Sequence, residues 1–218
     1  LGRLRSPSQL GFVRRINYVF LKDLKLRAPI FQAPMAGVST PELAAAVSNA
    51  GGLGALGLGA SNWESAAKQV GAFKVRSDGP LHLNFFCHDE PERNQTIEAA
   101  WIARFSSEFA ALKATTPNSL KNPYTSAKVD PQLIDFAREY RPHLISFHFG
   151  LPNKEILSAL KNLDIPIITS VTNLDDAALA LNTGVDGLIA QGIEAGGHRG
   201  TFDPSSDYDF SSNALTTL

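Results

Sequence analysis

One short segment near the end of the chain carries most of the residues suited to chemistry. Residues 191–200 read Gln-Gly-Ile-Glu-Ala-Gly-Gly-His-Arg-Gly, so four glycines surround a single histidine, His198. A glycine-rich backbone can bring its amides close to a ligand. Histidine titrates near neutral pH and can act there as an acid or a base. The segment therefore predicts a ligand-binding loop in which His198 is the acid–base residue.

Two further segments carry polar or small residues inside apolar surroundings. Residues 33–37 (Ala-Pro-Met-Ala-Gly) follow an apolar run, and a proline there cannot continue a β-ladder. The segment predicts either a tight strand-to-helix turn or a backbone that approaches a flat ring. Asn84 lies in the apolar run 81–86, and a buried amide needs a partner. A structural hydrogen bond and a bound heterocycle are both open for Asn84.

Other motifs argue against several kinds of site. Gly52, Gly54 and Gly57 satisfy G-x-G-x-x-G, but a helical pattern precedes them and they lie within the next strand. This context favours close helix–strand packing or backbone approach to a ligand over dinucleotide binding. The remaining histidines and the single cysteine, Cys87, lack the spacing of a zinc site, so no metal is expected. Neither a Walker A loop nor a G-x-S-x-G elbow occurs.

The elements that must position these residues follow a regular pattern. Short apolar runs read as buried parallel strands at 30–35, 53–58, 81–86, 144–149, 166–171 and 187–191. Helix signals separate them: Ser39 to Glu42 before one helix, Asn153 before a second and Asn173 before a third. This alternation predicts an α/β fold of the TIM (β/α)8-barrel type, incomplete, with about six of the eight β/α units. The candidate loops then share the C-terminal rim, where barrel active sites lie.

The long gap between the third and fourth predicted strands interrupts this regularity. Residues 87–143 hold a predicted helix at 97–114, a polar stretch at 117–123 and a shorter helix near 131–140. We interpret them as a helical insertion over one end of the sheet. The partial barrel spans 23–205, and a polar tail follows at 206–218.

Residues 1–22 differ from the rest of the chain. They contain five basic residues and no acidic residue, a composition that resembles a mitochondrial presequence. The alternative is a translated stretch that belongs to no fold and is disordered. The chain begins at Leu1, and its only methionine is Met35. We therefore expect a fragment, a processed product or a wrongly bounded gene model.

Composition bounds the remaining possibilities. The 218 residues include 20 Lys and Arg against 21 Asp and Glu, a net charge of -1, so no nucleic-acid partner is expected. The apolar runs are far shorter than the roughly 18 residues that span a bilayer, which argues against a membrane protein. A single cysteine cannot form an internal disulfide and fits a reducing compartment such as the cytoplasm.

The motifs, taken together and in order, resemble the nitronate monooxygenases, formerly called 2-nitropropane dioxygenases. The matching segments are residues 29–39, 42–44, 49–54, 83–86, 146–150 and 191–200. The resemblance implies an FMN-dependent barrel with an inserted helical segment. Members oxidise alkyl nitronates, such as propionate 3-nitronate, with dioxygen to carbonyl compounds and nitrite, and some accept neutral nitroalkanes.

The resemblance also implies roles for particular residues. Pro34, Met35 and Ala36 would lie along the flavin by their backbone, and His198 would be the catalytic histidine. Three further residues would contact FMN: Asn84, Gln191 and Gly196. The family continues with two more β/α units that hold the FMN phosphate, which this chain does not reach.

Two alternatives stay open. A flavin-dependent enoyl-acyl-carrier reductase has a related barrel and a similar Glu-Ala-Gly-Gly-His loop. Arg199 and the opening Ser-Thr-Pro-Glu-Leu-Ala at 39–44 favour nitronate oxidation. The other alternative is an inactive fragment of a nitronate monooxygenase.

Overall fold

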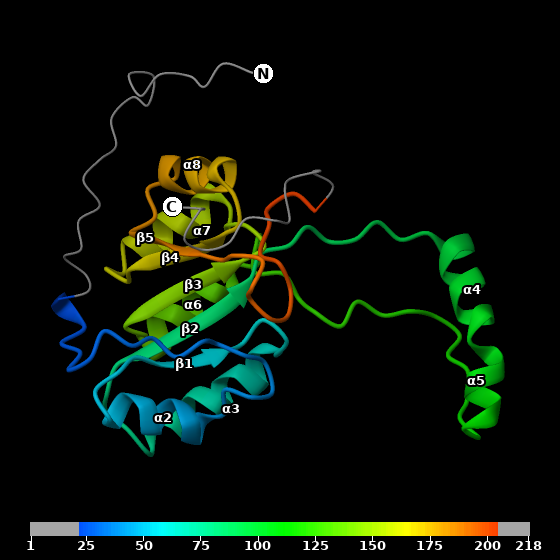
Figure 1. The fold of residues 1–218 in the computed structure, drawn as a ribbon, viewed down its shortest axis with the longest axis horizontal. Helices are drawn as coiled ribbons and strands as arrows, with labels where there is room; N and C mark the ends of the chain where they lie inside the picture. The colour runs from blue at the N-terminus through cyan, green and yellow to red at the C-terminus, as the bar shows by residue number, and fades with distance from the viewer. Residues whose placement is uncertain (1–21, 205–218) are drawn as a thin grey trace.

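The computed structural model describes residues 22–204 (Figure 1). The expectations for the leader, apart from Lys22, and for the tail at 206–218 lie outside these residues. The strands are β1 (Gly54–Gly57), β2 (Leu81–Phe86), β3 (Leu144–His148), β4 (Ile167–Val171) and β5 (Gly187–Ala190). The helices are α2 (Pro41–Asn49), α3 (Trp63–Lys74), α4 (Gln95–Arg104), α5 (Ser106–Ala111), α6 (Gln132–Tyr140), α7 (Lys154–Lys161) and α8 (Leu174–Asn182).

The five strands form one parallel sheet in the order β1-β2-β3-β4-β5. A doubly wound sheet reverses its strand order at a switch point, whereas consecutive strands of a (β/α)8 barrel lie side by side in sequence order. The sequential order therefore identifies this sheet as part of a barrel. The predicted fold class, an incomplete (β/α)8 barrel, is confirmed.

The first predicted strand, at 30–35, differs from the prediction. Only Phe31 makes a β-pairing, through a single parallel bridge to Leu53, the residue that precedes β1. Beyond it the Gln32 side chain continues the ladder, because Ala55 N donates to Gln32 Oε1 at 3.1 Å. Pro34, two residues later, has no N–H to donate. The described residues thus contain five strands and one bridging segment, not six strands.

The helix starts follow from their capping residues. Asn153 and Asn173 cap α7 and α8 as predicted, each accepting a backbone N–H from three residues ahead. Within the predicted start signal, Ser39 to Glu42, the residue that caps α2 is Thr40. Ser39 cannot serve there because its hydroxyl donates to Ala33 O and accepts from Met35 N.

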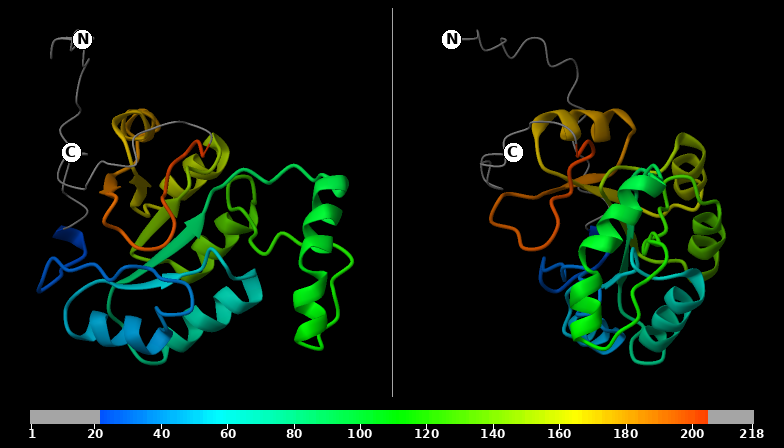
Figure 2. Two further views of the ribbon diagram at one scale, coloured as in Figure 1. Left: turned by 45° about the vertical axis from the view of Figure 1, so that its right-hand side comes forward. Right: turned by 90° about the vertical axis from the view of Figure 1, so that its right-hand side faces the viewer.

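The main core lies between the sheet and its helices. Helices α3, α6 and α7 cover one face, as Figure 2 shows. On that face the ring centroids of Trp63 and Phe136 are 5.1 Å apart, and both rings pack against Phe85 of β2. At Gly54 a Cβ would overlap the carbonyl oxygen of Ala44, so glycine lets α2 lie directly on β1. This glycine serves helix–strand packing.

A smaller cluster lies on the opposite, inner face of the sheet. Leu24 packs there against Leu53, Leu144 and Ile168. The segment that begins at Lys22 therefore crosses the inner face near the N-terminal ends of the strands. It leaves the C-terminal ends to the loops that carry the candidate site.

Helices α4 and α5 form an arm that stands away from the sheet (Figures 1 and 2). Neither helix has a buried residue, and the predicted continuous helix at 97–114 breaks at Phe105. The third helix of the predicted insertion, α6, belongs to the main core instead, with Leu133 and Ala137 fully buried. The arm extends beyond the end of the sheet and does not cover it. No described helix is long and apolar enough to cross a membrane.

Candidate functional site

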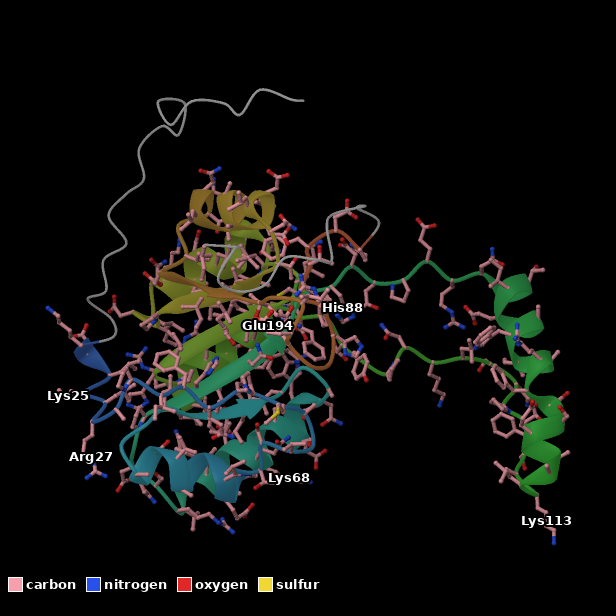
Figure 3. The ribbon with its side chains drawn as sticks, in the orientation of Figure 1. Lys25, Arg27, Lys68, His88, Lys113 and Glu194 are labelled. Carbon is pink, nitrogen blue, oxygen red and sulfur yellow. The ribbon has the colours of Figure 1, made fainter. Side chains whose placement is uncertain are left out.

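The candidate site lies at the C-terminal edge of the sheet, where parallel strands deliver their loops to one place. Residues 33–39 follow the bridging segment, and residues 191–204 follow β5. Figure 3 shows His88, just after β2, and Glu194, just after β5, at this edge, while Lys113 lies far away on the arm. Segments distant in sequence thus meet here.

The loop at residues 34–36 rests on β1. A Cβ at Gly57 would lie 3.0 Å from Ala36 N and 3.2 Å from Met35 C, so glycine permits this close approach. Met35 N donates to Ser39 Oγ at 2.9 Å, and Pro34 has no N–H. Of these three residues, only Ala36 has a backbone N–H without a hydrogen bond to another described residue. A ligand along this loop would therefore be offered the Ala36 N–H.

Asn84 belongs to a buried polar network on the inner face of the sheet. Its Nδ2 donates to Ser146 Oγ at 2.8 Å and lies 3.4 Å from Ser146 O. His82 Nε2 lies 2.6 Å from the same hydroxyl. Burial lowers the pKa of His82 to about 3, so this imidazole is neutral at physiological pH. Sequence reasoning identified Asn84 but missed Ser146, which is its partner, and His82, which bonds to Ser146.

Gln191 braces the loop that carries His198. Its Nε2 donates to His198 O at 3.0 Å, and its Oε1 accepts from Gly200 N at 2.7 Å. Both ends of the amide are thus engaged by the loop itself. Around Gly196 and Gly197, no heavy atom lies within 4 Å of the position that a Cβ would occupy. The backbone at Gly196 is therefore open to a ligand, whereas Gln191 holds the loop in shape.

His198 is exposed on this loop and faces an aromatic cluster centred on Phe149. The Phe149 ring centroid lies 5.8 Å from that of His198, 4.3 Å from that of His148 and 6.4 Å from that of His88. Phe149 has a φ of 68°, a left-handed conformation that strains a bulky residue and is common at functional sites. Burial lowers the pKa of His148. Sequence reasoning gave Phe149 and His148 no role, although both end a predicted strand at the catalytic rim.

The far end of the same loop is anchored by Asp176 of α8. Its Oδ2 accepts from Thr172 Oγ1 at 3.3 Å, from Asn173 Nδ2 at 3.0 Å and from Phe202 N at 3.4 Å. Burial raises the pKa of this carboxyl. The sequence showed Asp176 only as a residue of a helix, because its loop partner lies 26 positions away.

These groups suit a flat, polar heterocycle such as FMN. Asn84 supplies an amide, Ala36 and Gly196 supply accessible backbone, and the glycines leave room for close approach. Among residues 22–204, no group of three His, Cys, Asp or Glu side chains is placed to hold a metal ion. An organic cofactor held by amides therefore fits the residues present.

Comparison with known proteins identifies the family. The family model described as nitronate monooxygenase matches residues 19–216. The chain belongs to the nitronate monooxygenase family. A nitronate monooxygenase from Paraburkholderia phytofirmans is 45% identical over 196 residues, covering 89% of this chain and 54% of the relative. One from Pseudomonas aeruginosa is 43% identical over 185 residues, covering 85% of this chain and 53% of the relative.

Solved structures agree with this family assignment. A nitroalkane oxidase from Streptomyces ansochromogenes matches with a TM-score of 0.72 and 32% identity, covering 86% of this chain and 52% of the other. FabK from Thermotoga maritima matches with a TM-score of 0.55 and 26% identity, covering 82% of this chain and 45% of the other. The chain spans about half the length of the curated relatives it matches.

Proposed function

We propose that this nitronate monooxygenase family protein uses FMN and dioxygen to oxidise alkyl nitronates to carbonyl compounds and nitrite. The observation that supports the proposal most is the meeting of three segments at one edge of the sheet. These are the loop at 34–36, the strand that carries Asn84 and the loop that carries His198. The 45% identity to a nitronate monooxygenase adds to this support.

The proposal gives each part of the site a task. FMN, when bound, supplies the electron acceptor for the nitronate and the means of passing electrons to dioxygen. Ala36 and Gly196 offer backbone to the cofactor, and Asn84 offers its amide. His198 and the loop amides stabilise the anionic nitro group, which is the electrostatic part of the reaction. Because a nitronate is already a carbanion equivalent, it needs no proton removal.

Neutral nitroalkanes make a second demand on His198. The carbon next to the nitro group must lose a proton before oxidation. The acid–base group placed for this step is the imidazole of His198, which is exposed on the glycine-rich loop at this edge. The His148 ring is half-buried, and its Nε2 lies 3.4 Å from the carbonyl oxygen of His198. His198 is therefore the base that we assign to nitroalkane substrates.

The experiment is a direct comparison of two reactions. The purified protein is incubated with FMN and propionate 3-nitronate, and oxygen consumption and nitrite release are measured. In parallel, NADH-dependent reduction of a crotonyl thioester is followed. Nitrite release without thioester reduction is the expected result. Thioester reduction alone would favour the enoyl-acyl-carrier reductase alternative, and inactivity in both assays with FMN bound would contradict the proposal.

The identity of the flavin is tested separately. Cofactor released by heat from the protein purified from its natural source is separated by chromatography, and FMN is the expected product. The glycines at Gly52, Gly54 and Gly57 would suggest a dinucleotide, but Gly54 packs on Ala44 and Gly57 packs on the loop at 34–36. Recovery of FAD would contradict the assignment.

A further inference from the structure

Three polar side chains form a chain of hydrogen bonds inside the sheet, beneath the candidate site. Asn84 and His82 lie on the same face of β2, and Ser146 lies between them on the neighbouring strand β3. His82, Asn84 and Ser146 are 2%, 5% and 0% exposed. Polar groups buried this deeply are costly unless they are paired, so the direction of each hydrogen bond matters.

The direction begins at Asn84. Its amide nitrogen lies 2.8 Å from Ser146 Oγ and 3.4 Å from Ser146 O. A backbone carbonyl can only accept, so the amide atom facing Ser146 must be the nitrogen. Asn84 therefore donates to the Ser146 hydroxyl, and its Oδ1 is the atom that this network leaves unused.

The Ser146 hydroxyl fixes the next step. It accepts from Asn84 and has one hydrogen of its own to donate. Among the described residues, the acceptor that this hydrogen reaches is His82 Nε2, at 2.6 Å. His82 Nε2 is then unprotonated, and the proton of the neutral imidazole lies on Nδ1. The hydrogen bonds all run in one direction, from Asn84 through Ser146 to His82.

His82 contributes little else to the described structure. Its Nδ1 is buried and has no hydrogen-bond partner. An apolar side chain would fill the same position without this unpaired group. The single hydrogen bond from Ser146 is thus the interaction for which an imidazole at this position is needed.

We propose that His82 and Ser146 are positioning residues that hold the Asn84 amide with its oxygen toward the ligand, so that Asn84 accepts a hydrogen bond from an N–H group. The inference rests on the proposed function only in naming that ligand as a flavin, whose ring system carries an N–H group. A reversed tautomer at His82 would instead leave the Ser146 hydrogen without an acceptor.

The first experiment reads the tautomer directly and needs no ligand. Histidine labelled with 15N is incorporated into the protein, and long-range 1H–15N spectra at pH 7 report which ring nitrogen of His82 is protonated. The expected result is a proton on Nδ1 and none on Nε2. A proton on Nε2 would overturn the proposal, whether or not the protein binds FMN.

The second experiment tests the consequence for the ligand. Ser146→Ala and His82→Leu each break the chain, and we expect the dissociation constant for FMN, measured by fluorescence quenching, to rise about five- to tenfold. Ser146→Thr and His82→Gln keep a hydroxyl and an acceptor, so they should stay within about twofold of the wild type. Circular dichroism confirms that each variant is folded.

Ser170→Ala is the matched control. Ser170 is a buried serine of the neighbouring strand β4 and is not part of the chain of hydrogen bonds. Its replacement should leave both the His82 tautomer and the FMN affinity unchanged. If Ser170→Ala weakened FMN binding as much as Ser146→Ala, the effect would come from loss of any inner-face hydroxyl, and the positioning role would be refuted.

Discussion

Three histidine rings surround Phe149 at the C-terminal edge of the sheet, and their environments separate their roles. His148 is half-buried, with a lowered pKa, and its Nε2 faces the carbonyl oxygen of His198. His88 packs edge-on against Phe149 from the segment after β2. His198 alone of the three is exposed on a glycine-rich loop, so it has the freedom to meet a substrate.

Replacement of His198 by Asn should separate the two kinds of substrate. General base catalysis typically contributes about 10²–10⁴-fold, so oxidation of neutral nitroalkanes should fall by that order. Oxidation of pre-formed nitronates should fall much less, because they have no proton to lose. Steady-state oxygen consumption with both substrates measures the effect, and FMN absorbance checks that cofactor is retained. Equal losses on both substrates would limit His198 to substrate positioning.

The buried His82 should make the protein sensitive to acid. Its folded pKa of about 3 lies below the ordinary value of 6.5, so the unfolded chain binds more protons between these pH values. The free energy of unfolding is therefore undiminished above pH 6.5 and falls as the pH drops toward 3. One pKa unit corresponds to about 1.4 kcal/mol, so the loss is on the order of 4–5 kcal/mol.

Urea unfolding between pH 4 and pH 8 measures this dependence. His82→Gln removes the titrating group and should flatten the plot of unfolding free energy against pH. His88→Gln changes a histidine outside the strands and should leave most of the pH dependence in place. A curve for His82→Gln as steep as that of the wild type would show that other groups cause the acid sensitivity.

At this scale the sequence indicated the candidate residues better than it indicated their contacts. His198 stood out through its glycines, and Asn84 through its polar character in an apolar strand. Ser146 and His82 did not, because their pairing depends on the register between β2 and β3. Gln191 is predicted to contact the cofactor, and its amide also holds its own loop, a local contact that no periodicity reveals.

The elements depend on close packing between α2 and β1. At Gly54 an added methyl group would meet both the Ala44 carbonyl and the Ser48 hydroxyl. Ser48 Oγ also accepts from Gly54 N and donates to Pro80 O, so it cannot move away freely. The loop at 34–36 rests on the same strand. The position of β1 therefore bears on both α2 and the loop at 34–36.

Gly54→Ala should destabilise the protein by about 2–3 kcal/mol, the range for overpacking a tight site. Gly71→Ala is the matched control, because Gly71 lies in α3 with no heavy atom within 4 Å of its Cβ position. That change should stabilise the helix by up to about 1 kcal/mol. Denaturant unfolding compares the two, and equal stability of both variants would contradict the packing described for Gly54.

Within residues 22–204, the α4–α5 arm and the segment that follows it, up to Lys121, should be cleaved first. The arm contains no buried residue, and Trp101 and Leu112 are 52% and 79% exposed. Local opening therefore requires little loss of buried surface. Brief trypsin digestion should cut after Arg104, Lys113 or Lys121 before it cuts after Lys68 in α3. Mass spectrometry identifies the cuts, and early cleavage at Lys68 would contradict this order.

The elements themselves were largely predictable from local signals. Asn153 and Asn173 capped their helices as expected, because an Asx cap acts within three residues. The prediction of a strand at 30–35 was wrong, because the Gln32 side chain takes the place of the backbone as the partner of Ala55 N. The prediction that the helix at 97–114 lies over one end of the sheet was wrong. Its apolar residues predict a helix, but they do not indicate what the helix packs against.

At the scale of the whole molecule, the edge strand β5 and the exposed leucines of α8 favour association between copies of the chain. Within residues 22–204, β5 pairs with β4 on one side only, and most of its residues are half-buried. On α8, Leu174 and Leu179 are 69% and 55% exposed. Unpaired edges and exposed apolar side chains of this kind promote association.

The 218-residue chain, studied by itself, should therefore self-associate, bind a hydrophobic dye and hold FMN weakly. Sedimentation across a range of concentrations and dye fluorescence measure the first two properties, and titration with FMN measures the third.

Inward-pointing charges protect natural sheet edges, so Ile189→Lys on β5 should reduce association. Ile193→Lys is the matched control, because Ile193 is exposed on the loop beyond β5 and outside the sheet. A monomer at all concentrations, with no dye binding and stoichiometric FMN, would contradict this prediction and show that the β5 edge and the exposed leucines of α8 do not drive association.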